Sequence, residues 1–193
     1  MPAVIELIVK QELCIGCGIC VTVCTNDAIQ MQKNEYGFFV VASKSDTCRN
    51  EGECLKVCPF NVYPGSDVKT ETEIRKNYLE NPPNHNNHLG SYFRTYAGYS
   101  HFNRLTSSSG GIGTWLLVEL FKRKIINKAV VVNGSSTNKN HYEYVIVDNV
   151  QDISNSSGTK YYPVKMDEII RVIKADQNSR YAIVGVPCFV KAI

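Results

Sequence analysis

Hydrophobic and polar residues alternate most regularly near the N-terminus of the chain. Residues 28–41, AIQMQKNEYGFFVV, alternate on both sides of a turn at Asn34–Gly37, and this pattern predicts a β-hairpin. Together with its flanking segments, the hairpin indicates four short strands and two short helices. We therefore expect a small βαββαβ domain over residues 1–67.

The C-terminal part shows the pattern of an α/β layer. Apolar residues at helical spacing predict a helix through Ile112, Trp115, Leu116, Leu117, Leu120 and Phe121. Strands are predicted at residues 128–132, 142–147 and 180–186, with a further helix near 165–175. Residues 106–193 thus indicate an α/β domain with too few strands to finish its sheet. The last strand runs into Pro187, and a helix beginning at Phe189 has no room to form.

Residues 68–105 separate these two domains and are mostly polar. The stretch ENPPNHNNHLG (80–90) combines two prolines with an asparagine-rich run, which predicts a helix stop followed by a loop. His85 and His88 are expected to be solvated there and not to bind metal. We expect this linker to lie against the following domain, with aromatic residues that offer contact surface: Tyr92, Phe93, Tyr96 and Tyr99.

Composition and charge narrow the class of protein. The 193 residues are 44% apolar and 20% charged, which is typical of a globular protein with a core. The net charge of +3 divides into −2 for residues 1–70 (6 Lys/Arg, 8 Asp/Glu) and +5 for the remainder (15 and 10). No dense basic run with interleaved aromatic residues occurs, so nucleic-acid binding is not expected.

The N-terminal sequence and the cysteines predict a cytoplasmic location. MPAVIELIVKQELC has no basic segment ahead of an apolar one, so we expect no signal peptide. No run of about 18 apolar residues exists, so no membrane span is expected. In a reducing cytosol, clustered thiols more often bind metal or do redox chemistry than form disulfides. Seven of the eight cysteines lie within residues 14–58, which favours such chemistry there.

The first cysteine motif, CIGCGICVTVC, has the spacing C-x2-C-x2-C-x3-C and comprises Cys14, Cys17, Cys20 and Cys24. Three cysteines at this spacing wrap a loop around one iron–sulfur cluster, and the fourth reaches a second cluster. Gly16 and Gly18 suit a tightly turning loop whose N–H groups point at sulfide. Structural zinc is the alternative, although it usually pairs two C-x2-C knuckles across a longer loop.

The second motif, CRNEGECLKVCP, repeats the first 34 residues later. Three cysteines of the first motif have counterparts at Cys48, Cys54 and Cys58. The counterpart of Cys17 is Glu51, so one ligand position is changed within an intact frame. A carboxylate is a harder ligand than a thiolate, which favours an oxygen-ligated or three-iron (3Fe-4S) cluster. In the competing interpretation, Glu51 is exposed beside an ordinary four-iron cluster whose ligand comes from elsewhere.

These motifs resemble the bacterial two-cluster ferredoxin domain. The resemblance implies that 4Fe-4S cluster one is held by Cys14, Cys17, Cys20 and Cys58. Cluster two would be held by Cys24, Cys48 and Cys54. The chain departs from the family pattern at two positions. Thr25 replaces the proline after the fourth cysteine, and Glu51 replaces a ligand, which leaves the composition of cluster two open.

A Ser/Gly-rich segment precedes the predicted helix at residue 112. Such a segment exposes free N–H groups at a helix N-terminus, where a phosphate can bind. A capped helix with close packing at Gly110 and Gly111 explains the same residues equally well. The segment is neither a Walker nor a Rossmann motif, because no lysine follows the glycines and no strand leads directly into it.

Three later stretches resemble the coenzyme F-420 hydrogenase/dehydrogenase beta-subunit family: SSGGIGTWLL (108–117), SSGTKYYPV (156–164) and YAIVGVPCFVKAI (181–193). Such proteins are flavin-dependent oxidoreductases with FAD in the α/β domain. The resemblance implies that the flavin diphosphate is bracketed by Ser108, Ser109, Gly110 and Gly111. It places Gly158, Thr159, Lys160 and Tyr161 near the flavin. Cys188 would ligate a further cluster with downstream partners, or else be a small apolar residue at a strand end.

The fold class expected from these patterns is α+β, a two-cluster ferredoxin-like domain followed by an incomplete α/β flavin-binding-type domain. The family resemblance implies a missing C-terminal half. The expected function is an electron relay between a redox partner protein and a flavin that acts on an organic substrate. The alternatives are an iron–sulfur electron-carrier module without flavin, or a truncated product without activity.

Overall fold

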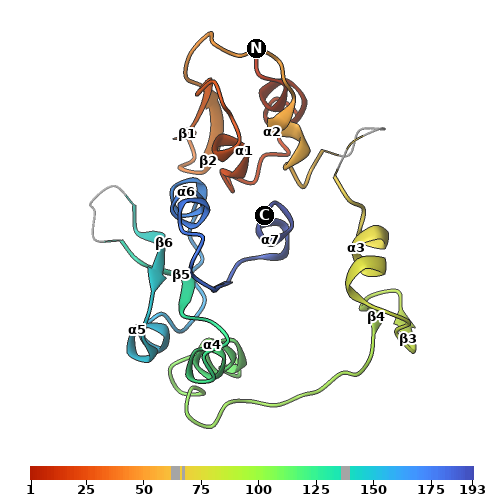
Figure 1. The fold of residues 1–193 in the computed structure, drawn as a ribbon, viewed down its shortest axis with the longest axis vertical. Helices are drawn as coiled ribbons and strands as arrows, with labels where there is room; N and C mark the ends of the chain where they lie inside the picture. The colour runs from red at the N-terminus through yellow and green to blue at the C-terminus, as the bar shows by residue number, and fades with distance from the viewer. Residues whose placement is uncertain (62–65, 67, 136–139) are drawn as a thin grey trace.

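The computed structural model describes residues 1–61, 66, 68–135 and 140–193. Figure 1 shows an N-terminal unit that contains the cysteine motifs and, below it, a second unit built on a small sheet. No described helix has the length and apolar character needed to cross a membrane.

Over its described residues, 1–61 and 66, the N-terminal unit contains one hairpin and three short helices. The predicted hairpin is confirmed: β1 (Ile29–Lys33) pairs antiparallel with β2 (Phe39–Ser43). The helices are the π-helix η1 (Ile5–Val9), α1 (Ile19–Thr22) and α2 (Glu53–Lys56). The expectation of four strands is wrong at the N-terminus, where η1 forms. Its apolar residues Ile5 and Ile8 lie three apart and are both buried, a spacing that suits a helix and not a strand.

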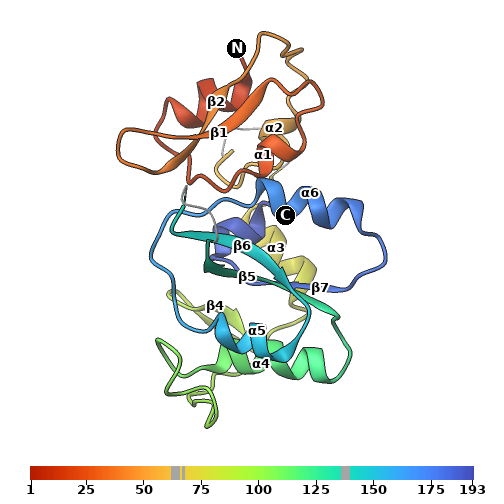
Figure 2. The same cartoon turned by 90° about the vertical axis from the view of Figure 1, so that its left-hand side faces the viewer.

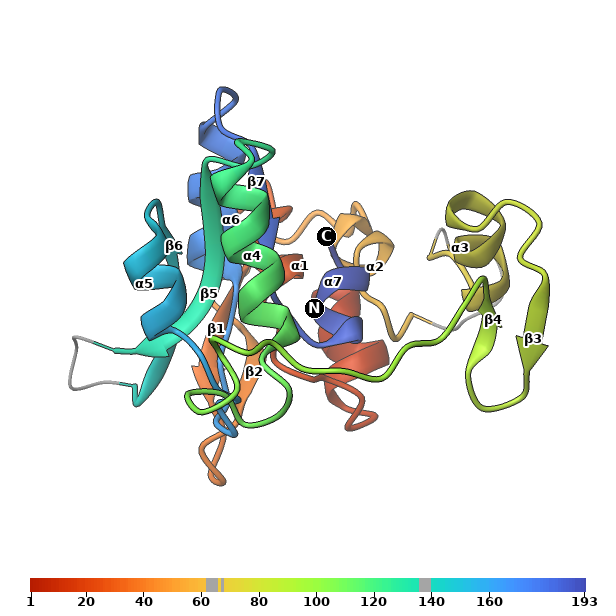
Figure 3. The same cartoon turned by 90° about the horizontal axis from the view of Figure 1, so that it is seen from below.

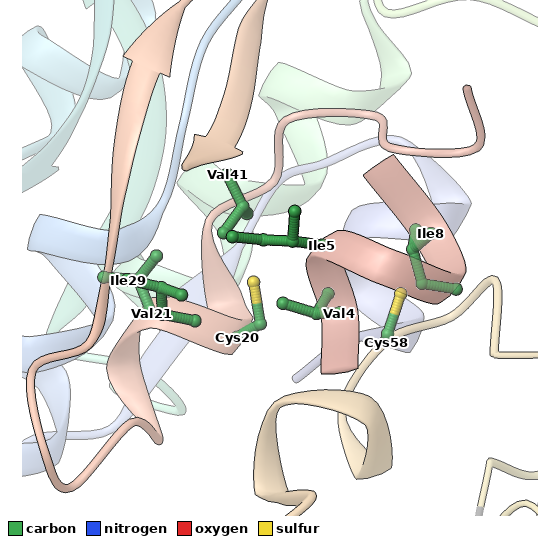
Figure 4. Close-up of a cluster of buried hydrophobic side chains, with 8 residues drawn as sticks. All are labelled: Val4, Ile5, Ile8, Cys20, Val21, Ile29, Val41 and Cys58. Atoms are coloured by element: carbon green, nitrogen blue, oxygen red, sulfur yellow. The ribbon is translucent and has the colours of Figure 1, made fainter. Parts of the chain in front are cut away.

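The core of this unit lies between η1, the hairpin and the cysteine loops. Figure 4 shows eight buried side chains that meet there: Val4, Ile5, Ile8, Cys20, Val21, Ile29, Val41 and Cys58. Two cysteines from different motifs, Cys20 and Cys58, therefore belong to one apolar cluster. The sulfur atoms are surrounded by aliphatic groups that keep water away from them.

Residues 71–92 form a separate excursion: α3 (Glu71–Tyr78) and a hairpin of β3 (Asn84–Asn86) with β4 (Gly90–Tyr92). Short strands thus replace part of the expected loop. Of the aromatic residues expected to offer contact surface, Tyr96 is 84% and Tyr99 65% exposed, while the neighbouring Ser100 N–H donates to the Gly110 carbonyl at 2.7 Å. Figures 1 and 3 show α3 and the hairpin standing away from the sheet. The physical reason is that α3 buries none of its residues.

The second unit is a three-stranded sheet with helices on both faces. In order, its elements are α4 (Ile112–Lys122), β5 (Lys128–Gly134), β6 (Tyr142–Val147), α5 (Val150–Asn155), α6 (Asp167–Ala175), β7 (Tyr181–Ile183) and α7 (Pro187–Lys191). The sheet order is β6-β5-β7, antiparallel for β5 with β6 and parallel for β5 with β7. Figure 2 shows α6 on the face toward the N-terminal unit and α4 with α5 on the other.

The alternation of β5 explains this layering. Val130 packs with Met166 and Ile170 from the α6 side, whereas Ala129 and Val131 belong to the cluster formed with α4 and α5. Successive side chains of a strand point to opposite faces. The central strand is therefore buried on both sides, as its continuous apolar sequence KAVVV predicts.

Two short helices differ from the expectations. α5 was not predicted, and it begins at Asn149, whose side chain accepts a hydrogen bond from the Asp152 N–H at 2.9 Å. The expectation that no helix forms at the C-terminus is wrong. α7 begins at Pro187 and buries Phe189 against Tyr144 of β6. Proline suits the first helical position, and burial of the phenyl ring stabilises a helix that is only five residues long.

The two units are joined through α6. The Met166 N–H donates to the Cys17 carbonyl at 2.8 Å, and the Arg171 guanidinium donates to the Val21 carbonyl at 3.0 Å. Cys17 and Ile19 of the first motif are part of the same apolar cluster as Val130, Met166 and Phe189. The loop of the first cysteine motif is therefore built into the core of the second unit.

Asp176 secures the connection from α6 to β7. Its carboxylate accepts hydrogen bonds at 2.7 Å from the Lys128 ammonium, the Ser179 hydroxyl and the Tyr181 hydroxyl. These groups, the Lys128 ammonium foremost, hold the pKa of Asp176 well below its usual range. A lowered pKa stabilises the fold wherever the unfolded carboxyl is also ionised, and that stabilisation fades only as the pH falls below about 4.

We predict that Asp176→Asn lowers the midpoint of anaerobic thermal unfolding, because the amide cannot replace the charged acceptor. The deficit should be constant from about pH 5 to 8, since the native carboxyl stays ionised throughout. Asp46→Asn, at an exposed carboxylate, is the control and should leave the midpoint unchanged. A deficit that disappears within this pH range would contradict the assignment.

Candidate cluster sites and the adjoining pocket

Site one is a small cavity around four thiols of the N-terminal unit: Cys14, Cys17, Cys20 and Cys58. Burial raises the pKa of Cys17 to about 11, and the neighbouring Cys58 and Cys14 thiols add to this effect. Burial also raises the pKa of Cys20 and of Cys58. Thiolates packed so closely in an apolar cavity need a compensating positive charge, which an iron–sulfur core supplies.

Site two is a second cavity, lined by Cys24, Cys48, Cys54 and Glu51. Burial raises the pKa of Cys54, and Cys24 and Cys48 raise it further. These three cysteines are only partly buried and Glu51 is exposed. The structure thus gathers the seven N-terminal cysteines into the two groups that the ferredoxin resemblance implies.

The donor sets of both sites fit iron–sulfur clusters. A cluster needs cysteine thiolates distributed around a body of several atoms, and each set surrounds a cavity. Within the described parts of the chain, no three His, Cys, Asp or Glu side chains converge closely enough to hold a single metal ion.

The 34-residue repeat is visible in the backbone. α1 and α2 are offset by 34 residues, and each follows a left-handed glycine, Gly18 at φ 81° and Gly52 at φ 78°. Two residues earlier, Gly16 and Asn50 are also left-handed, at φ 73° and φ 56°. Glu51 is consequently presented by the same loop conformation that presents Cys17.

The surroundings of the two loops differ. A methyl group added at Gly16 would lie 2.4 Å from the Phe39 carbonyl oxygen, and one at Gly18 would lie 3.1 Å from Asp167. A methyl group at Gly52 would meet nothing within 4 Å. Site one is therefore enclosed by the hairpin and by α6, whereas site two faces solvent.

A large pocket of about 810 Å³ adjoins site one. Of the eight residues predicted to contact a flavin, seven line it: Ser108, Ser109, Gly111, Gly158, Thr159, Lys160 and Tyr161. Gly110 does not, because it packs against the Gly98 carbonyl oxygen, 2.9 Å from where its methyl group would be. Cys14 lines both this pocket and the cavity of site one.

Hydrogen bonds connect the two loops that form the pocket edge. The Ser108 hydroxyl accepts from the Thr159 N–H at 2.8 Å, and the Ser107 and Ser157 hydroxyls lie 3.0 Å apart. Segments about fifty residues apart in sequence are thereby held in register. The left-handed conformation of Gly158, at φ 85°, allows the second loop to turn beside Ser108.

Lys160 lies at the pocket edge, but its ammonium is engaged by its own loop. It donates to the carbonyls of Ser156 at 2.9 Å, Ser157 at 2.5 Å and Gly158 at 2.9 Å. Burial lowers the pKa of this ammonium. Lys160 therefore holds the loop after α5 in place and contributes a positive charge near the pocket.

Sequence reasoning missed several pocket residues: Phe38, Phe39, Tyr144, Tyr162 and Phe189. The first two come from the hairpin of the N-terminal unit, and no local pattern signals that a hairpin tip will close a pocket in another unit. Tyr162 directly follows Tyr161, which was predicted to lie near the flavin, and this adjacency is the signal that could have identified it. Residues 184–186, expected to continue the last strand, follow the end of β7 and line the pocket, although the Val184 N–H still donates to the Val130 carbonyl at 3.0 Å.

Cys188 lies in α7, half-buried against the apolar cluster that contains Cys17. Its thiol is close enough to raise the pKa of Cys17 and of Tyr144, each of which is raised mainly by burial. The structure therefore places Cys188 beside site one and the pocket wall.

Two families of known proteins match the chain. Residues 13–62 match the 4Fe-4S dicluster domain, and residues 95–171 match the N-terminal domain of the coenzyme F-420 hydrogenase/dehydrogenase beta subunit. The second match begins inside the segment expected to be a linker. The protein therefore belongs to the iron–sulfur dicluster class. More particularly, the part that follows this ferredoxin domain resembles, over residues 95–171, the N-terminal domain of the coenzyme F-420 hydrogenase/dehydrogenase beta subunit.

Individual relatives match different shares of the chain. An uncharacterised protein of Methanocaldococcus jannaschii is 22% identical over 192 residues, covering 93% of the chain and 51% of that protein. An uncharacterised ferredoxin of the same organism is 39% identical over 58 residues, covering 30% of the chain and 74% of that protein. The polyferredoxin protein MvhB of Methanothermus fervidus is 27% identical over 77 residues, 40% of the chain and 17% of that protein. The chain thus spans about half the length of the first relative.

We predict that Gly16→Ala is more damaging than Gly52→Ala. Both variants carry the cost of a left-handed alanine, about 1–2 kcal/mol. Gly16→Ala additionally forces a methyl group against the Phe39 carbonyl, and overpacking typically costs about 1–3 kcal/mol. Anaerobic thermal unfolding and iron per chain measure the difference. Equal losses in both variants would show that the first loop is not enclosed as described.

Proposed function

We propose that the chain is the iron–sulfur part of a flavin-dependent oxidoreductase and relays electrons between a redox partner protein and a flavin. The observation that carries this proposal is the position of Cys14, which lines both site one and the large pocket. A ligand of cluster one would thereby form part of the wall around the flavin. Contact of this kind suits electron transfer, because a residue that lines both cavities would leave a short path between their occupants.

The pocket suits a flavin dinucleotide in size and chemistry. Its volume of about 810 Å³ falls within the range of cofactor pockets, about 300–1,000 Å³. The N-terminus of α4, with Gly111 left-handed just before it, offers free N–H groups to a diphosphate. The Ser108 and Ser109 hydroxyls lie at the same edge, and aromatic side chains such as Tyr161 and Phe38 offer flat surfaces for a ring system.

The chain's own residues would bind, orient and shield these groups. Clusters and flavin, when bound, supply one-electron and two-electron transfer respectively. Cys14, Cys17, Cys20 and Cys58 would hold cluster one in a cavity closed to water by Val4, Ile8 and Val41. Phe38 and Phe39 would close the pocket on the side of the N-terminal unit.

The exposed side of site two is where we place the redox partner protein. Cys48 and Glu51 lie at the surface of the N-terminal unit. They belong to the second cysteine motif, whereas Cys14, which lines the pocket, belongs to the first. A partner bound there would face cluster two, and Cys14 would face the flavin. The flavin would exchange electrons with an organic substrate. A cysteine-rich protein without disulfides fits a cytosolic location.

A simpler candidate is an electron-carrier module without flavin. It is favoured by the ferredoxin relatives, which match only 40% and 30% of the chain. In that case the pocket would be an unoccupied surface depression. The two candidates differ in whether FAD binds at the pocket.

We predict that the anaerobically purified chain binds FAD and that Gly113→Phe weakens this binding about tenfold or more. Gly113 lines the pocket, and a Cβ added there would meet nothing within 4 Å, so a phenyl group can be introduced beside the pocket without a clash at its base. Gly98→Phe, also in open space and outside the pocket lining, is the control. Quenching of flavin fluorescence gives both affinities. Clusters without any FAD affinity would favour the carrier.

For cluster two we propose an oxygen-ligated or three-iron composition. For the chain as purified we expect the three-iron form, with about seven irons and the EPR signal of an oxidised three-iron cluster, and Glu51→Cys should give about eight irons and abolish that signal. The variant restores the full cysteine set of the motif. Iron content and EPR that do not change in Glu51→Cys would mean that Glu51 is not at the cluster.

A further inference from the structure

The two positions at which the chain departs from the ferredoxin pattern are in contact. The Thr25 hydroxyl donates a hydrogen bond to Oε2 of Glu51 at 3.0 Å, across 26 residues of sequence. Both residues line site two together with Cys24, Cys48 and Cys54. From this contact we propose that Thr25 and Glu51 form one unit, in which Thr25 positions the carboxylate as a detachable ligand for a divalent cation at one corner of cluster two.

The internal repeat supplies the comparison. Adding 34 to Cys17 and to Thr25 gives Glu51 and Pro59, and both Cys17 and Pro59 line site one. Pro59 has no hydrogen-bond donor, and the Cys17 thiolate needs no such donor to be held in place. At site two the longer, more mobile carboxylate has a donor opposite it. The two substitutions therefore match each other chemically at equivalent places in the repeat.

The hydrogen of the Thr25 hydroxyl is directed by a second bond. The Asn26 amide donates to the Thr25 hydroxyl oxygen at 3.2 Å. A hydroxyl has one hydrogen, and with Asn26 approaching its oxygen that hydrogen is left for Glu51. The relay runs from Asn26 through Thr25 to Glu51, and it ends on one carboxylate oxygen only.

The remaining carboxylate oxygen is available to a cation. Among the described residues no hydrogen-bond or ion-pair partner reaches Oε1 of Glu51. Thr25 directly follows Cys24, so a carboxylate tied to its hydroxyl stays at the rim of the cavity. The backbone on both sides of Glu51 is left-handed, at Asn50 and Gly52, as it is around Cys17. Backbone and hydrogen bond together hold Glu51 at the ligand position.

The solvent exposure of Glu51 and Thr25 determines how a cation binds at this corner of cluster two. Glu51 and Thr25 are both exposed, so a cation can enter and leave from solvent. Thiolate and sulfide select thiophilic divalent cations, and a single carboxylate oxygen binds them less firmly than a fourth thiolate would. We therefore assign to this corner the exchange of Fe²⁺ and of similar cations such as Zn²⁺. This inference rests on the composition proposed above for cluster two.

Uptake is an association reaction. When bound, a three-iron core reduced by one electron from dithionite would carry no net core charge, and addition of one Fe²⁺ would give a core of charge 2+. The entering ion would exchange its water ligands for Oε1 of Glu51 and for sulfur atoms of the cluster. Release reverses these steps and leaves the carboxylate bonded to Thr25.

The test uses the full chain, anaerobic and reduced with dithionite, titrated with Fe²⁺ and in a parallel series with Zn²⁺. Occupancy is read from the EPR spectrum and from metal per chain after desalting. Thr25→Val removes the donor at nearly constant shape and should weaken cation binding about 10–100-fold, the range for loss of an outer-shell partner. Thr25→Ser keeps the hydroxyl and should bind within a few-fold of the parent. Thr72→Val, at an exposed threonine of α3, is the matched control and should bind as the parent does.

The outcomes separate this inference from the proposed function. Weaker binding in Thr25→Val with recovery in Thr25→Ser supports it. Unchanged or tighter binding in Thr25→Val overturns it, provided that Glu51→Ala still weakens binding. If Glu51→Ala also has no effect, the proposed composition of cluster two is wrong as well. Cluster one, monitored by its own EPR signal on reduction, reports whether each variant is folded.

Discussion

The hydrogen bond from the Met166 N–H to the Cys17 carbonyl is the contact on which the rest of the arrangement depends. It joins a loop that surrounds cluster site one to the start of α6. Around it, side chains of both units share one apolar cluster, so neither unit has a complete core without the other. The position of site one beside the pocket is fixed by this shared core.

The same shared core explains why the two halves of a repeated motif behave differently. Packing on α6 and on the hairpin leaves no room at Gly16 and Gly18, whereas the equivalent second loop meets only solvent. Local sequence gives both loops the same backbone conformation. Their tertiary surroundings then make one site closed and the other accessible. A carboxylate in place of a thiolate is tolerated at the accessible site, because water can solvate it there.

Much of the local structure could be predicted from sequence. The hairpin, β6 and the helix near 165–175 appear where periodicity placed them, since each buries one regular face. η1 and α7 were mispredicted, because their stability comes from packing of Ile8 and Phe189 against distant segments. For the same reason, no pattern in the sequence indicated that Phe38 and Phe39 close a pocket in the other unit. The Thr25–Glu51 contact also lies beyond sequence reasoning, although both departures were visible separately.

The position of Cys14 has a thermodynamic consequence. Cys14 and Ile15 line both cavities, so with the proposed cluster and flavin in place the free energy of filling one would depend on the state of the other. Such coupling is reciprocal by necessity: an occupant of the pocket that prefers the reduced state of site one would itself be bound more tightly when that site is reduced. In the proposed relay, this shared wall would make the affinity of the pocket a function of electron supply without any moving part.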